Sequence, residues 1–120
     1  MEIDQLLTVE DHEKGARMNV EDQSGKKTDI ILILAGMDSK KYSKAKTMLS
    51  REILSEPNGD TEEMRAKALS KITLGWEGLT DKNEPVEFSQ KKAKNLYSGA
   101  PYIMNQVDAF VIDRANFTKG

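Results

Sequence analysis

The chain from residue 16 to residue 34 alternates apolar and polar side chains in the way that β-hairpins do. In "ARMNVE", Ala16, Met18 and Val20 fall on one side and polar residues on the other, which is the period of a strand with one buried face. "DQSGKK" supplies turn-forming residues, and "TDIILIL" has the composition of a second strand. The pattern therefore predicts a β-hairpin over residues 15–36.

The second strand of this hairpin is apolar on both faces. Ile30, Leu32 and Leu34 face one way, and Ile31 and Ile33 face the other. A two-stranded hairpin is marginal by itself, so one face is expected to pack on helices. The other face then needs cover from a third strand, a neighbouring subunit or a partner.

We expect Ile31 and Ile33 to be contacts for a partner or for self-association, helped by the apolar N-terminal residues Ile3, Leu6 and Leu7. A strand edge beside that face has unpaired backbone groups, which an added strand satisfies. The alternative is that the N-terminal segment folds back over the same face within one monomer. The sequence leaves both arrangements open.

Four helices are predicted in the rest of the chain. The first begins at an N-cap on Asp38 or Ser39, and the second begins at Asp60 after the helix-stopping "PNG". Ser89 is the predicted N-cap of a short third helix. The fourth begins near Pro101 and extends to the terminal "ANF".

The only tryptophan is expected at the end of the second helix. Met64, Ala68, Ile72 and Trp76 are four residues apart, which is the spacing of an apolar helical stripe. "TDKNEP" then forms an exposed polar loop. We expect Trp76 and Phe88 to pack on each other across this loop.

These elements predict a small, mainly helical α+β fold with about four helices and an N-terminal β-hairpin. Its 120 residues, 38% of them hydrophobic and 32% charged, suit one domain with a modest core. Within that domain, residues 1–14 are the segment with least predicted order, residues 15–36 the hairpin and residues 38–117 the helical region.

Charge and composition remove several functional classes. The formal net charge of -2 provides no overall attraction for nucleic acid or for anionic membranes. Cysteine is absent, which removes disulfides and thiolate chemistry. The first fifteen residues have neither a basic region nor a long apolar run, so we expect an intracellular protein without a signal peptide or membrane span.

Residue patterns typical of catalytic or metal sites are weak. His12 is the single histidine, and in a polar N-terminal segment it is expected to be an ordinary surface residue. Asp81 and Asn83 begin like a calcium loop, but Pro85 occupies the next ligand position and Lys92 the closing one. No glycine-rich phosphate loop is present. We therefore expect no catalytic residue, cofactor or metal, and a protein that is not an enzyme.

Lysines gather on two of the predicted helices, at positions 40, 41, 44 and 46 and at positions 91, 92 and 94. Such clusters occur in nucleic-acid-binding proteins, but they also occur on the solvated faces of ordinary helices. No aromatic side chains lie between them to stack on bases. We expect no nucleic-acid partner, and a small nucleic-acid-binding regulator remains as an alternative.

The segment "ITLGWEGLTDKNEPVEFSQKKAKNLYSGAPYIMNQVDAFVIDRANF" resembles the C-terminal half of tail assembly chaperones of long-tailed bacteriophages and prophages. The shared order is a helix ending in Trp76 and Gly78, a polar turn leading to Pro85, Phe88 and Ser89, a short helix, and a final helix running to the terminal "ANF". The first half of the chain is similar only in its order of elements.

The resemblance implies a role in assembly through protein contacts. Members of this family bind the tape measure protein, keep it in solution and recruit tail tube subunits around it, without a cofactor. The resemblance thus implies a protein of the bacterial host cytoplasm that is absent from the mature virion. A homo-oligomer is an expectation from the apolar face of Ile31 and Ile33. The alternative within the same setting is a structural tail or head–tail component.

Overall fold

The computed structural model describes residues 1–118. It confirms an α+β fold in which helices make up most of the regular structure beside an N-terminal β-hairpin. Along the chain the elements are η1 (Ile3–Gln5), α1 (Val9–Lys14), β1 (Ala16–Glu21), β2 (Lys27–Leu34), α2 (Lys40–Ser55), α3 (Thr61–Ile72), β3 (Thr73–Glu77), β4 (Thr80–Asp81), β5 (Glu84–Pro85), α4 (Gln90–Gly99), α5 (Pro101–Val111) and η2 (Arg114–Phe117).

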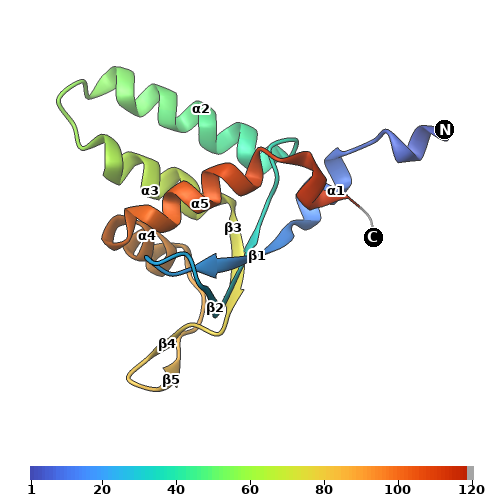
Figure 1. The fold of residues 1–120 in the computed structure, drawn as a ribbon. Helices are drawn as coiled ribbons and strands as arrows, with labels where there is room; N and C mark the ends of the chain where they lie inside the picture. The colour runs from blue at the N-terminus through green and yellow to red at the C-terminus, as the bar shows by residue number, and fades with distance from the viewer. Residues whose placement is uncertain (119–120) are drawn as a thin grey trace.

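The predicted hairpin is two-thirds of a three-stranded antiparallel sheet with the order β1-β2-β3. Because β2 is central, its backbone is paired on both sides. In the register, Leu32 lies opposite Met18 on β1 and opposite Trp76 on β3. Helices α2, α3 and α5 lie above this sheet in Figure 1. The sheet therefore has one face on the helices and one face away from them.

The prediction that Trp76 ends the second helix is wrong, and the helical region over residues 38–117 also contains three short strands. Helix α3 stops at Ile72, and residues 73–77 form β3 along the free edge of β2. Thr73 and Gly75 are poor helix formers, whereas β2 has a row of backbone groups that only another strand can pair. The four-residue spacing of apolar residues continues from Ile72 to Trp76, although the helix ends at Ile72.

The predicted polar loop "TDKNEP" is a small β-hairpin, in which Thr80 pairs with Pro85 and Asp81 with Glu84. Lys82 and Asn83 occupy its turn with φ of 51° and 68°. Tight two-residue hairpin turns need positive φ at both central positions, and asparagine accepts this conformation more readily than most residues. Asn83 thus occupies a position that the turn geometry itself explains.

Three predicted helix starts are confirmed by their capping hydrogen bonds. The Ser39 hydroxyl accepts from the backbone N–H of Tyr42 at 3.1 Å, which decides between Ser39 and Asp38. Asp60 caps α3 and Ser89 caps α4 in the same way. Pro101 occupies the first turn of α5, where its missing N–H costs nothing.

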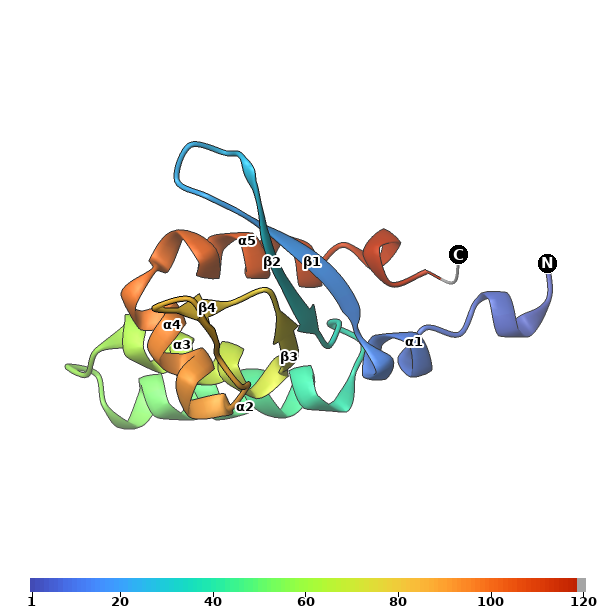
Figure 2. The same ribbon diagram turned by 90° about the horizontal axis from the view of Figure 1, so that it is seen from below.

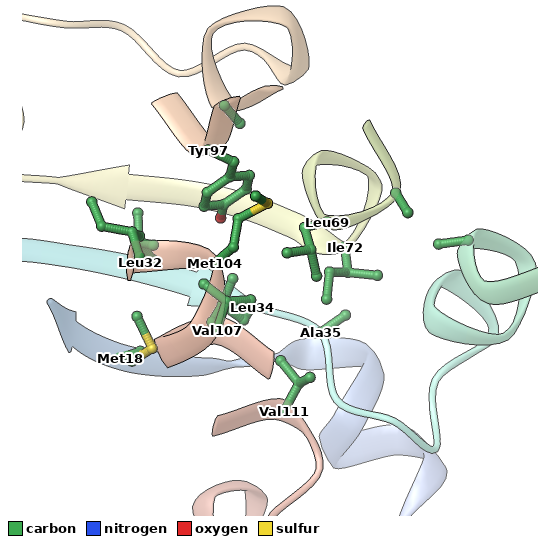
Figure 3. Packing of buried hydrophobic residues seen from close by; sticks show 14 of the residues in the cluster. Met18, Leu32, Leu34, Ala35, Leu69, Ile72, Tyr97, Met104, Val107 and Val111 are labelled. Carbon is green, nitrogen blue, oxygen red and sulfur yellow. The ribbon is translucent and has the colours of Figure 1, made fainter. Parts of the chain in front are cut away.

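The hydrophobic core lies between the sheet and the helices (Figure 3). Leu32 and Leu34 on β2 and Met104 and Val107 on α5 are fully buried there. Tyr97 on α4 is buried with them, and its hydroxyl lies 2.7 Å from the hydroxyl of Thr73. These contacts fix which face of the sheet is internal.

Candidate functional site: interaction surfaces

The outer face of the sheet, the face turned away from the helices, carries Ile31 and Ile33. Both side chains are partly buried, while Leu32 and Leu34 on the opposite face are fully buried. Ile31 lies opposite Asn19 and Glu77, and Ile33 lies opposite Arg17 and Gly75. The third strand extends the sheet at its side, so it does not cover these isoleucines. The outer face remains a candidate contact surface.

An ion pair crosses this outer face. The Arg17 guanidinium donates two hydrogen bonds to the Glu77 carboxylate, at 2.5 and 2.9 Å. This hydrogen bonding and the opposite charge raise the pKa of Arg17 and lower the pKa of Glu77. Because the residues sit on β1 and β3, the pair passes over β2. It lies between Ile31 and Ile33.

The N-terminal arm, defined here as residues 1–7, is a separate apolar surface. Ile3, Leu6 and Leu7 are 75%, 62% and 64% exposed. The arm points away from the sheet in both views of the molecule (Figures 1 and 2). The structure therefore does not bring these residues to Ile31 and Ile33. The alternative in which the segment folds back over the outer face is not the observed arrangement.

The tryptophan-glycine motif, Trp76 and Gly78 with the Pro85 and Phe88 that follow, makes contacts that stabilise the fold. The Trp76 indole meets the Phe88 ring edge-to-face, with centroids 5.0 Å apart, and its N–H donates to the Val86 carbonyl at 2.8 Å. The predicted packing between these two rings is present. Gly78 has φ of 79°, and a Cβ there would lie 2.1 Å from the carbonyl oxygen of Asp29. Pro85 ends the small hairpin.

His12 is not the surface residue that the sequence predicts, because only 1% of it is exposed. Its ring stacks on Phe117 with centroids 4.6 Å apart, and its Nδ1 accepts the backbone N–H of Asp38 at 3.0 Å. Helix α1 is thereby fixed against the start of α2 and the end of the chain. No local pattern reveals this, since its partners are 26 and 105 positions away.

The Asp38 carboxylate completes a polar cluster around this histidine. It accepts two hydrogen bonds from Arg114, at 2.8 and 2.9 Å, and one from the Thr8 hydroxyl at 2.6 Å. The Arg114 hydrogen bonds are the main reason that the pKa of Asp38 lies well below its usual range. His12 Nδ1 accepts the backbone N–H of Asp38, and Nε2 lies 3.7 Å from the Asp38 carboxylate. The cluster joins α1, the residue before α2 and η2.

Neither a metal site nor a membrane-spanning helix is found in residues 1–118. Residues 1–118 contain no group of three or more histidines, cysteines or acidic residues placed to hold a metal ion. Across the same residues, every helix is too short or too polar to traverse a lipid bilayer. These findings leave the outer face of the sheet and the N-terminal arm as the main features to be explained.

The lysines of α2 do not share one face, because Lys46 lies over the Tyr42 ring and away from the groove that Lys41 and Lys44 line. Lys41 and Lys44 line a groove of about 240 Å³ with Lys71 of α3 and Gln90, and Ala45 and Met48 form its apolar part.

Comparison of this chain with known protein families, characterised proteins and solved structures yields no match. Its function is therefore argued from its own surfaces.

Proposed function

We propose that this protein is a phage tail assembly chaperone that binds the tape measure protein and helps to recruit tail tube subunits. The outer face of the sheet is the observation that carries the proposal. It presents Ile31 and Ile33, both partly exposed, on either side of the Arg17–Glu77 ion pair. The tryptophan-glycine motif, from which the resemblance to this family starts, supports it from the sequence.

The spacing on the outer face suits an apolar helix. Residues two apart on a strand are separated by roughly 6.6 Å, and same-face residues on a helix are about 5–6 Å apart. Side chains at positions i and i+4 of a tape measure helix can thus lie against Ile31 and Ile33 together. The Arg17–Glu77 pair crosses β2 between the two isoleucines, so it lies within such a contact, where each charge keeps the other as its hydrogen-bond partner.

The test is co-purification with a tape measure protein from a tail gene cluster that encodes a protein like this one. Ile31→Lys/Ile33→Lys is expected to remain folded by circular dichroism and to lose the tape measure protein. Ile53→Lys/Leu54→Lys is the matched control, because both residues are exposed apolar side chains at the end of α2. This control is expected to retain the partner.

Retention of the partner by the Ile31/Ile33 variant, or equal loss in the control, contradicts the proposal. If the lysine variant unfolds, Ile31→Thr/Ile33→Thr becomes the decisive variant, since threonine keeps strand propensity while removing apolar surface. Mass spectrometry of purified particles separates a chaperone from a structural tail component. We expect this protein in the cytoplasm of infected cells and not in mature particles.

A further inference from the structure

We propose that the N-terminal arm of one copy docks into the basic groove beside α2 of a second copy. The basic groove is lined by Lys41, Lys44, Ala45, Met48, Lys71 and Gln90. This interface is separate from the outer face of the sheet, to which the tape measure protein is assigned. It therefore holds or fails independently of the proposed chaperone function.

The arm has the form of a preorganised apolar ligand. Ile3, Leu6 and Leu7 follow the i, i+3, i+4 spacing that places side chains on one side of a helical turn. The turn η1 is closed by a reciprocal capping box between Glu2 and Gln5. These local bonds order the arm although its three apolar side chains lie mostly in solvent. An ordered ligand loses less conformational entropy on binding.

The basic groove supplies a complementary apolar floor. Ala45 is buried at its base and Met48 is partly exposed. Lysine side chains lay their methylene stems along such surfaces while keeping the ammonium group in water. Methionine adapts its shape to different apolar partners more readily than branched residues do. The groove can therefore accept leucine and isoleucine side chains between the lysine stems.

The charges of the arm and of the groove are opposite. Glu2 and Asp4 are the charged side chains of the arm, and both are acidic. Lys41, Lys44 and Lys71 form no ion pair with any acidic group in residues 1–118, whereas Lys67 pairs with Glu52 and Lys94 with Glu63. The first turn of α2 also contains two lysines and no acid, which opposes the helix dipole. Acidic side chains from another copy would relieve this excess of positive charge.

The geometry favours docking between copies over docking within one chain. His12 and Glu13 fix α1 at the start of α2, where the Glu13 carboxylate accepts the backbone N–H of Lys40 at 2.5 Å. The arm leaves that point in the direction away from α2 in both views (Figures 1 and 2). A reciprocal exchange of arms gives a closed dimer, and a one-way exchange gives a longer chain of subunits.

The test is the association state of the full chain in analytical ultracentrifugation. The arm variant is Ile3→Ser/Leu6→Ser/Leu7→Ser, and the groove variant is Lys41→Glu/Lys44→Glu. Each is expected to weaken self-association by at least roughly tenfold. Lys26→Glu/Lys27→Glu, at the exposed end of the β1–β2 hairpin, makes the same charge change as the groove variant and is expected to associate normally.

Mixing the two variants distinguishes exchange between copies from any other mode of association. The groove variant has an intact arm and the arm variant has an intact groove, so the mixture is expected to regain a heterodimer that neither forms alone. A wild-type chain that stays monomeric at high micromolar concentration overturns the proposal. So does self-association that persists in either variant, or a mixture that remains monomeric.

Discussion

Arg17 and Glu77 form a bidentate ion pair across the central strand β2, joining the two edge strands of the sheet on its outer face. Their side chains are 57% and 54% exposed, so water competes strongly with the interaction. The pair lies between the residues that β2 presents outward, Ile31 and Ile33. Its position places it inside the proposed partner surface, on the side of the sheet away from the core.

Removing this ion pair is expected to change stability little. Arg17→Ala/Glu77→Ala should melt close to the wild type, with the remaining difference disappearing at high salt because exposed pairs are screened. Thermal melts at low and high ionic strength measure this. Tape measure protein binding should persist, since the isoleucines remain. A large, salt-independent loss of stability shows that water and salt do not screen the pair as its exposure implies.

Replacing Trp76 is expected to destabilise the protein. Trp76→Ala removes the edge contact with Phe88, the hydrogen bond to Val86 and the packing opposite Leu32. The cost should be about 3 kcal/mol, measured as a shift in the urea midpoint at constant slope. Trp76→Phe keeps an aromatic ring and should cost less. Unchanged stability together with lost partner binding makes the tryptophan a recognition residue and refutes its structural role.

A side chain at position 36 is expected to release helix α1. A Cβ at Gly36 would lie 2.2 Å from His12 Nδ1, so Gly36→Ala forces the histidine out of its site. We expect a loss of about 2 kcal/mol and faster amide hydrogen exchange in α1. Gly99→Ala is the control, because nothing lies within 4 Å of its Cβ position. Equal behaviour of the two variants contradicts the close contact at His12.

Alkaline pH is expected to destabilise the fold through Tyr97. The Thr73 hydroxyl donates its hydrogen to the Leu69 carbonyl, so it accepts from Tyr97, which must be protonated to donate. Burial raises the pKa of Tyr97 to about 12. The unfolded chain releases this proton near pH 10 and the folded chain retains it, so stability is intact below pH 10 and falls as pH rises further.

Tyr97→Phe separates this effect from other alkaline titrations. The variant should lose about 1 kcal/mol at neutral pH with its hydrogen bond, and it should lack the extra decline of the wild type between pH 10 and 12. Urea unfolding across this pH range measures both quantities. Parallel curves for the two proteins indicate that Tyr97 ionises as freely in the folded state as in the unfolded state.

Chelators are expected to leave the melting curve unchanged. His12 has its Nδ1 engaged by the Asp38 backbone, and Asn83 lies in a tight turn with positive φ. Differential scanning fluorimetry with EDTA, then with added calcium or zinc, checks this expectation. A reproducible stabilisation by micromolar metal identifies a site that these residues do not explain.

Patterns set by near neighbours determined much of the fold from sequence alone. The alternation in residues 16–34 specified the hairpin and its two faces, because strand geometry places successive side chains on opposite sides. Ser39, Asp60 and Ser89 marked helix starts correctly, because a capping side chain bonds to backbone only three residues away. The apolar outer face followed from Ile31 and Ile33 for the same local reason.

Tertiary structure decided the features whose partners are distant in the chain. Residues 73–77 became a strand because the edge of β2 lay beside them, although Trp76 fits the helical spacing of α3. His12 is buried because it accepts a hydrogen bond from the Asp38 backbone and stacks on Phe117, both distant in the sequence. The periodicity of neighbouring residues contains no information about these long-range contacts. Their free energy comes from strand pairing and side-chain packing between segments that only the folded chain brings together.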